Sequence, residues 1–182
     1  MKKFLPALAI SFVFTALMIS QLVINGQELA ASQTEKDKSQ FSLFENQFTK
    51  LKTVSSKGTD INLEEVKEPI VILNFWASWC RPCIAEFKTL NSLIRKFPKM
   101  VKVVGINNDT EDAKKLINKI ETKHELLFDS IVDMKGDYAD RFKVMSVPAS
   151  IVFYKGKVIK FIKKEYDFVS EEFLELVKSK ID

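Results

Sequence analysis

Two cysteines separated by two residues carry the most reactive chemistry in this chain of 182 residues. Cys80 and Cys83 lie in the segment Trp79-Cys80-Arg81-Pro82-Cys83. On the first turn of a helix, such a pair can close and open a disulfide without refolding of the chain. The unpaired N–H groups, the helix dipole and the Arg81 cation should lower the thiol pKa of Cys80 below its usual ~8.5. The pattern predicts an exposed, nucleophilic Cys80 and a more buried, resolving Cys83.

Other uses of a cysteine pair fit this sequence less well. A structural disulfide between Cys80 and Cys83 would close so short a loop that it adds little stability. A zinc site needs four ligands, and the chain has no second cysteine pair and one histidine, His124. Covalent haem attachment needs a histidine directly after the second cysteine, where Ile84 stands. We therefore interpret the pair as redox-active.

A strand and a helix must position these cysteines. The nearly continuous apolar run 70–76 is typical of a strand buried on both faces. Pro82 suits an early helix position, where a missing N–H removes no hydrogen bond. The apolar residues that follow recur at steps of four and three and predict one helix face, which Pro98 ends: Cys83, Phe87, Leu90, Ile94 and Phe97.

The rest of the chain predicts a mixed sheet flanked by helices. We expect a short hairpin in which 48–54 forms the first strand, and a buried strand at 101–106. A helix capped by Asp109 or Thr110 should follow, then a hairpin of 150–153 and 157–162, and a last helix capped by Ser170. The order hairpin, β, α, β, α, β, β, α corresponds to an α/β, thioredoxin-like fold with an N-terminal β-hairpin extension.

The segment 74–83, Asn-Phe-Trp-Ala-Ser-Trp-Cys-Arg-Pro-Cys, resembles the active-site segment of thioredoxin-fold proteins. In detail it is similar to the TlpA/ResA-like (DsbE/CcmG-type) branch, the membrane-anchored thiol–disulfide oxidoreductases of bacteria, and the resemblance covers about 41–182. It implies that Pro148 is cis and lies against the disulfide, and that the backbone of Val147 pairs with an extended substrate. It also implies that the substrate-binding rim is formed by Trp79, Arg81, Pro82, Val147 and Pro148.

An amide and a carboxyl group distinguish this branch from cytosolic thioredoxins. Asn74 stands where those proteins carry a buried aspartate, and an amide cannot act as a base for the buried thiol. Glu86 matches a glutamate of the ResA-like branch, which implies a proton-transfer or pKa-tuning role. If Glu86 is partly buried, its pKa should rise, and its charge would oppose a second negative charge on Cys83. The alternative is a solvated helix glutamate without a role.

The resemblance implies that the protein reduces disulfides, with apocytochrome c in cytochrome c maturation as the leading substrate. Cys80 would attack the substrate disulfide and Cys83 would resolve the mixed disulfide. A second membrane protein would supply the reductant, because the chain has no flavin or nucleotide fingerprint; no cofactor is expected beyond the Cys80–Cys83 disulfide. Two alternatives stay open: a disulfide donor to folding exported proteins, and a copper-site assembly or metal-handling module. We interpret His124 as a surface residue rather than a metal ligand.

The N-terminus is typical of a membrane signal. Lys2 and Lys3 precede the uncharged run 4–24, which is about the ~20 residues that cross a bilayer. Cleavage after Ala30 or Ala31 would leave no small residue at position −3, which favours an uncleaved anchor over a cleaved signal peptide. We expect a signal anchor at 1–31, a polar tether at 32–40 and a thioredoxin-like domain at 41–182. By the positive-inside rule, that domain lies on the extracytoplasmic side of the bacterial cell membrane.

Charge composition argues against nucleic-acid binding. The chain has 28 basic and 24 acidic residues, a net charge of +4, and no basic stripe interleaved with aromatic residues. Only three of the basic residues are arginine, the side chain that best recognises phosphates and bases. A chain of this length can bury a core without disulfides or metals, so its two cysteines are free for chemistry.

Overall fold

The computed structural model describes residues 5–181 of the chain. The chain divides into two units, residues 1–42 and 43–182. Helix α1 (Leu5–Thr49) forms the first unit, and its last residues, from Leu43 on, belong to the second. The second unit contains the sheet and the cysteines. Its start is two residues after the expected start of the domain.

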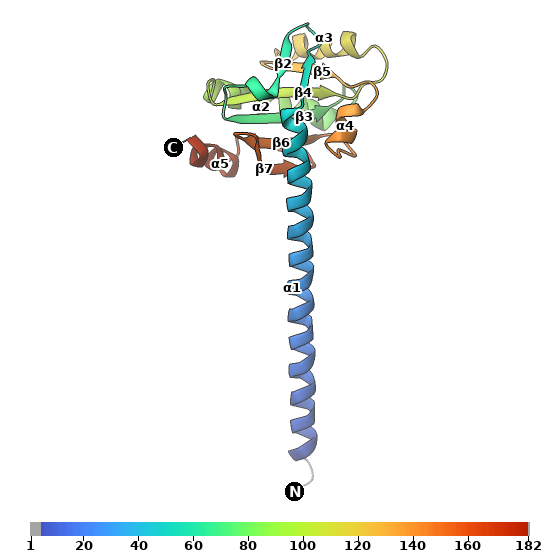
Figure 1. The fold of residues 1–182 in the computed structure, drawn as a ribbon, viewed down its shortest axis with the longest axis vertical. Coiled ribbons are helices and arrows are strands. Elements are labelled where there is room, and N and C mark those ends of the chain that lie inside the picture. Colours follow the sequence, from blue (N-terminus) through green and yellow to red (C-terminus); the bar gives the residue numbers. More distant parts are fainter. Residues whose placement is uncertain (1–4, 182) are drawn as a thin grey trace. The chain divides into compact units, whose positions relative to one another are not determined.

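The second unit is built on a five-stranded mixed sheet in the order β5-β4-β3-β6-β7 (Figure 1). Strands β3, β4 and β5 are parallel, and β6 is antiparallel to both β3 and β7. All seven residues of the central strand β3 are buried, as expected of a strand with helices on both faces. Strand β5 is missing from the order of elements predicted above. The strands are β3 (Ile70–Trp76), β4 (Val101–Asn107), β5 (Asp129–Val132), β6 (Ala149–Tyr154) and β7 (Lys157–Ile162).

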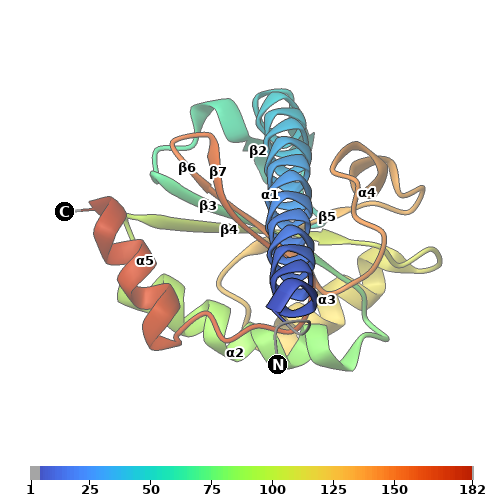
Figure 2. The same ribbon diagram turned by 90° about the horizontal axis from the view of Figure 1, so that it is seen from below.

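Helices cover both faces of this sheet (Figure 2). One face packs against α2 (Arg81–Lys96), α3 (Ala113–Lys123) and α5 (Glu171–Ile181), in a core that contains Trp76, Phe87 and Phe173. The other face packs against α4 (Asp137–Arg141) and the end of α1. There the ring centroids of Phe75 and Phe142 are 5.9 Å apart, and those of Phe48 and Phe153 are 4.5 Å apart. The predicted thioredoxin-like arrangement is confirmed.

The expected hairpin is present but shorter, because Phe48 belongs to the last turn of α1. Phe44 and Phe48 are four residues apart, so both lie on one face of this helix, and both are buried. The hairpin consists of β1 (Lys52–Val54) and β2 (Asp60–Asn62), followed by a short 3-10 helix, η1 (Leu63–Glu65).

The two predicted helix caps have different outcomes. Ser170 caps α5 as expected, since its Oγ accepts the N–H of Phe173 at 3.4 Å. The cap predicted for α3 is wrong: the residue before this helix is Asp112, in the left-handed region with φ 49°. Asp109 is instead buried, and its carboxylate bonds to the loop that precedes Cys80.

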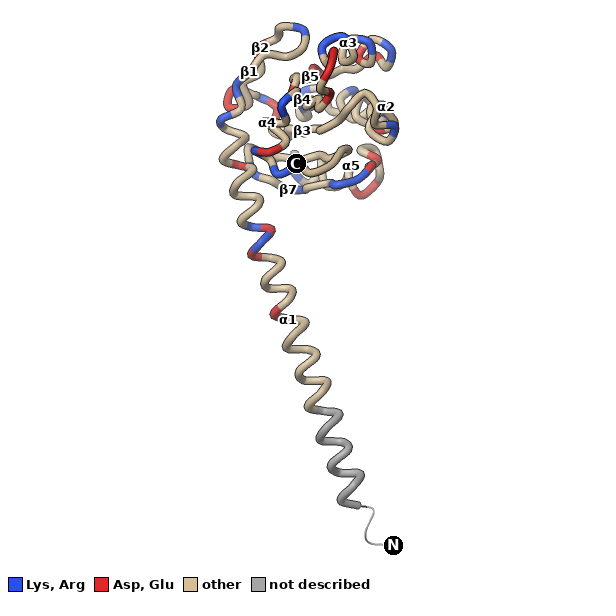
Figure 3. The backbone as a smooth tube through the Cα atoms, turned by 90° about the vertical axis from the view of Figure 1, so that its right-hand side faces the viewer, with Lys and Arg blue, Asp and Glu red and all other residues tan. Residues whose placement is uncertain are grey.

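The segment interpreted as a polar tether is helical. Apart from Glu28, the charges of the described first unit gather in this segment (Figure 3). Gln33 donates to Asp37 at 3.2 Å and Lys38 pairs with Glu35 at 3.8 Å, contacts at the i,i+4 and i,i+3 spacings typical of a helix. The segment has no apolar periodicity, so the sequence pattern did not indicate a helix. Its glutamine, glutamate and lysine residues are nevertheless good helix formers.

The expected membrane anchor is not confirmed. Among residues 5–181, no helix combines the length and the hydropathy that a bilayer span requires. Residues 1–4, with which the expected anchor begins, lie outside the described residues. The anchor at 1–31 therefore stays a prediction.

Candidate active site

The cysteine pair lies where strand β3 passes into helix α2. Cys80 and Cys83 form a disulfide with their Cα atoms 5.3 Å apart. Cys80 is the N-cap of α2, and its Sγ accepts the N–H of Cys83 at 3.3 Å. This places the sulfur of Cys80 at the positive end of the helix, as the sequence predicted.

The prediction of an exposed Cys80 is wrong for this oxidised form, although the relative order of exposure is confirmed. Cys80 is 4% exposed and Cys83 is 0% exposed. The sulfur of Cys80 is directed at Cys83 and at the start of its own helix, which hides it from solvent. An incoming sulfur must therefore approach along the rim around the pair.

That rim carries two strongly exposed apolar side chains. Trp79 is 70% exposed and Met145 is 95% exposed, and both line a pocket of about 210 Å³. Arg81 and Pro82 are exposed, Val147 is half-buried and Pro148 is buried. The Val147–Pro148 peptide bond is cis, as the family resemblance implied. The pocket is lined by Trp79, Asn108, Ala139, Val144, Met145, Ser146 and Val147, of which the sequence predicted only Trp79 and Val147.

Glu86 lies on the inner face of α2, one helical turn after Cys83. Its side chain is buried, with 2% of the residue exposed, which excludes the alternative of a solvated glutamate. Its Oε1 accepts the backbone N–H of Tyr166 at 2.7 Å, and its Oε2 accepts the Nδ2 group of Asn74 at 3.3 Å. The same amide donates to Ser150 Oγ at 2.9 Å. Two neutral donors, one from β3 and one from the loop between β7 and α5, thus bond to this carboxyl group.

Burial raises the pKa of Glu86 to about 7. The hydrogen bonds from Tyr166 and Asn74 stabilise the ionised form and lower the pKa, but burial outweighs them, and the nearby charge of Glu165 raises it further. Both forms of the carboxyl group are therefore populated near neutral pH. A group with this pKa, three residues from Cys83 on one helix face, is suited to accept and return a proton.

The loop between β7 and α5 closes over Glu86. Besides the Tyr166 hydrogen bond, the N–H of Phe168 donates to Thr89 Oγ at 3.3 Å, and the Thr89 hydroxyl donates to the carbonyl of Glu86 at 2.9 Å. A surface pocket of about 360 Å³ beside this loop is lined by Ala85, Glu86, Thr89, Glu165, Tyr166 and Asp167. Glu86 therefore lies beside two other acidic residues of this pocket, Glu165 and Asp167.

Sequence reasoning missed Ser150 and Tyr166. Ser150 meets Asn74 only because β6 pairs with β3 in a register that places these residues side by side. Tyr166 contributes its backbone N–H, a group that every residue except proline carries, so its identity gave no signal. Of this cluster, the sequence singled out only Glu86 and Asn74.

His124 does not take part in this site. It is half-buried, with its ring centroid 6.3 Å from that of Phe87. Within the described part of the chain, no cluster of three or more histidine, cysteine, aspartate or glutamate side chains is arranged to hold a metal ion.

Residues 41–162 match the AhpC/TSA family. The chain belongs to this family. Among curated relatives, it is 34% identical to the thioredoxin-like protein YneN of Bacillus subtilis and 32% identical to the thiol-disulfide oxidoreductase ResA of Bacillus thuringiensis. Each match covers 60% of this chain and 63% of the relative, a little less than two thirds of the relative's length.

Solved structures share the fold. A thiol:disulfide interchange protein of the thioredoxin family from Chlorobium tepidum superposes with a TM-score of 0.63 at 18% identity, over 72% of this chain and 93% of that chain. The resemblance predicted from residues 74–83 is thus confirmed at the level of family and fold.

Proposed function

We propose that this protein is an extracytoplasmic thiol–disulfide oxidoreductase that reduces disulfides in exported proteins. The observation that carries the proposal is the pairing, on one helix, of a disulfide at the N-terminus with a buried glutamate whose pKa is raised to about 7. The name of the relative ResA, a thiol-disulfide oxidoreductase, supports the same activity.

In the reduced protein, the Cys80 thiolate attacks one sulfur of the substrate disulfide. The substrate S–S bond breaks, one substrate sulfur leaves as a thiolate that takes up a proton, and a mixed disulfide with Cys80 forms. Cys83 then attacks the Cys80 sulfur and releases the second substrate thiol. Two electrons pass from the cysteine pair to the substrate, and the Cys80–Cys83 disulfide of this structure is the product.

Glu86 would move the proton of the second step. Its ionised form takes the proton of the Cys83 thiol, which makes Cys83 a nucleophile, and its protonated form returns the proton to the leaving substrate thiolate. A negative charge on Glu86 and one on Cys83 repel each other, so deprotonation of Cys83 is favoured only as Glu86 takes up the proton.

For the substrate we propose apocytochrome c, and for the electron donor a membrane protein that carries a dithiol. The rim residues Trp79, Arg81 and Pro82 would contact the substrate, and the Val147 backbone next to Pro148 would pair with its extended chain. None of the hydrogen bonds among the described residues uses the backbone N–H or C=O of Val147, which leaves both groups available. The domain at 41–182 would be held outside the cytoplasm by the anchor at 1–31.

One observation favours the opposite direction, donation of the disulfide to folding proteins. Arg81 directly follows Cys80, and its cation stabilises a thiolate there, which makes a disulfide more oxidising. The two directions differ in the reduction potential of the pair.

Turnover of a protein disulfide tests the activity itself. The full chain should accelerate reduction of insulin by dithiothreitol, and Cys80→Ser should return the rate to that of dithiothreitol alone. Cys83→Ser should accumulate a mixed disulfide that is visible on a non-reducing gel. Retained turnover in Cys80→Ser would contradict the assignment of the nucleophile, and a parent chain without turnover would contradict the proposed function.

A further inference from the structure

A second buried carboxylate fixes the loop in front of Cys80. Asp109, the second residue after β4, is 3% exposed. Its two carboxylate oxygens share the backbone N–H of Ser78 at 3.1 Å each, and Oδ1 accepts the Ser78 hydroxyl at 3.1 Å. Oδ2 accepts Nδ2 of Asn107 at 2.9 Å, and the N–H of Asp109 donates to Oδ1 of Asn107 at 3.1 Å. Ser78 thus supplies two of the three groups that bond to this carboxylate.

These bonds hold the turn that carries Trp79. Ser78 precedes Trp79, and on its other side the N–H of Cys80 donates to the carbonyl of Ala77 at 3.1 Å. The side chain of Trp79 is mostly in solvent, so its own packing does little to fix its direction. The backbone on either side must do so, and on the Ser78 side that backbone is held by Asp109.

The neighbouring residue, Asn108, connects to another segment that lines the rim pocket. Nδ2 of Asn108 donates to Asp133 at 3.3 Å. The Asp133 carboxylate also accepts the N–H groups of Tyr138 and Ala139 at 3.1 and 3.0 Å, at the start of α4. Ala139 and Asn108 both line the 210 Å³ pocket that Trp79 borders. Two consecutive residues that follow β4, Asn108 and Asp109, are therefore hydrogen-bonded to segments that line this pocket or precede a residue lining it.

We propose that Asp109 is a positioning residue for substrate binding: through Ser78 it holds Trp79 at the wall of the rim pocket and so sets the affinity for polypeptide disulfides. The inference rests on the proposed function, which it deepens by assigning the rim pocket to the polypeptide around the substrate disulfide. A small disulfide that reaches the sulfurs without filling this pocket should depend much less on Asp109.

The position calls for a group that only accepts hydrogen bonds. A carboxylate can accept all the donors that face Asp109, whereas an asparagine there would direct its NH₂ at Ser78 or at the Asn107 amide. The double variant Asn107→Asp/Asp109→Asn exchanges the two groups. In it, the amide of residue 109 can donate to the new carboxylate and still accept from Ser78. The exchange keeps the net charge of the chain.

The experiment compares two substrates with the full chain. For insulin, Asp109→Ala should raise KM about tenfold, because the variant loses the hydrogen bonds that hold Ser78 and with it Trp79. The change in kcat should be much smaller. The rate with 5,5′-dithiobis(2-nitrobenzoate), a small disulfide, should fall far less than kcat/KM for insulin. The exchange variant should recover most of the insulin KM.

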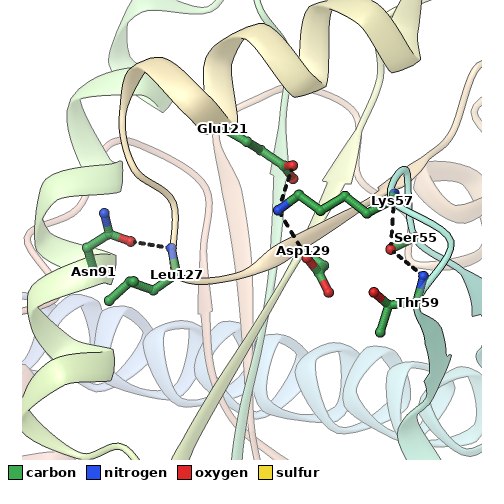
Figure 4. Close-up of polar contacts among 7 residues, drawn as sticks. All are labelled: Ser55, Lys57, Thr59, Asn91, Glu121, Leu127 and Asp129. Atoms are coloured by element: carbon green, nitrogen blue, oxygen red, sulfur yellow. Dashed lines mark hydrogen bonds and ion pairs between the residues drawn. The ribbon is translucent and has the colours of Figure 1, made fainter.

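Glu121→Gln is the matched control. Glu121 is also a buried carboxyl group, 4% exposed, but it lies on α3 and pairs with Lys57 away from the rim pocket (Figure 4). The control should leave the insulin KM at the parent value. Equal losses for both substrates in Asp109→Ala, or an insulin KM that does not change, would overturn the inference.

Two further measurements keep the inference testable. If Asp109→Ala does not fold, Ser78→Ala, which removes only the hydroxyl, should raise the insulin KM about threefold, and an unchanged KM overturns the inference. If the parent chain reduces neither substrate, the proposed function fails, and the positioning of Trp79 is read from fluorescence anisotropy in a Trp76→Phe background. Asp109→Ala should then lower the anisotropy of Trp79, and an unchanged anisotropy overturns the inference.

Discussion

Two buried carboxyl groups of this protein, Glu86 and Glu121, have different kinds of partners. Glu86 is 2% exposed and Glu121 is 4% exposed, and each lies on a helix that packs on the same face of the sheet. Glu121 lies 3.0 Å from the ammonium group of Lys57, which also reaches Asp129 at 3.2 Å (Figure 4). Glu86 has only neutral donors, the Tyr166 N–H and the Asn74 amide.

The difference in partners explains a difference in use. The Lys57 cation lies between two carboxylates and joins the turn of the hairpin to α3 and β5. The pKa of Lys57 is raised although burial lowers it, because Glu121 and Asp129 favour its charged form. That arrangement is a structural clamp. Without a cation, burial decides the pKa of Glu86, and the group becomes able to exchange a proton near neutral pH.

Among the tests of this difference between Glu86 and Glu121, we predict the largest effect for Glu86→Gln, which should change how stability depends on pH. Because the folded protein holds the Glu86 proton up to about pH 7 and the unfolded chain releases it near 4.5, the free energy of unfolding falls as pH rises through that window. The variant should lack this fall. The difference in unfolding free energy, variant minus parent, should therefore be about 3 kcal/mol larger at pH 8 than at pH 4. Urea unfolding of the oxidised protein across this range measures the difference.

The neighbouring charge provides a graded version of this test. Glu165→Gln removes one cause of the raised pKa of Glu86 and leaves the burial of Glu86 unchanged. The decrease in unfolding free energy with pH should therefore end at only slightly lower pH. Parallel stability curves for the parent and Glu86→Gln would remove the basis of the contrast with Glu121.

A smaller effect is expected at the clamp. Lys57→Ala leaves Glu121 buried without its cation, which should cost about 1–3 kcal/mol of unfolding free energy, since Lys57 itself is half exposed. Turnover of insulin per folded molecule should not change, because the clamp does not touch the cysteine pair. Thermal unfolding and turnover measured on the same preparation check both statements. A loss of turnover with intact stability would show that the two regions are coupled.

The smallest predicted effect concerns Ser150, which holds the Asn74 amide from the far side. Ser150→Ala removes one hydrogen bond and should cost about 1 kcal/mol of unfolding free energy. Asn74 Nδ2 would keep its bond to Glu86, so the window in which stability falls with pH should stay in place. A displaced window would show that Ser150 helps to set the proton affinity of Glu86.

Local patterns in the sequence predicted the strand before the cysteines and the helix after them, whereas the burial of Glu86 stayed open between two alternatives. The strand and the helix depend on residues close together in the chain. The partners of Glu86 and Asp109 depend instead on the tertiary fold: Tyr166 is 80 residues from Glu86, and Ser78 is 31 residues from Asp109. The wrong helix cap has the same origin, since nothing local marked Asp109 for a bond to Ser78 rather than to its own helix.

The reduction potential of the Cys80–Cys83 pair tests the central claim, that this protein reduces disulfides, most directly. The full chain would be equilibrated at pH 7 with graded mixtures of a thiol and its disulfide and followed by tryptophan fluorescence. The account predicts a value near or below about −250 mV, in the range of thioredoxin. A value near about −120 mV, in the range of strong periplasmic oxidants, would contradict it and make the protein a disulfide donor.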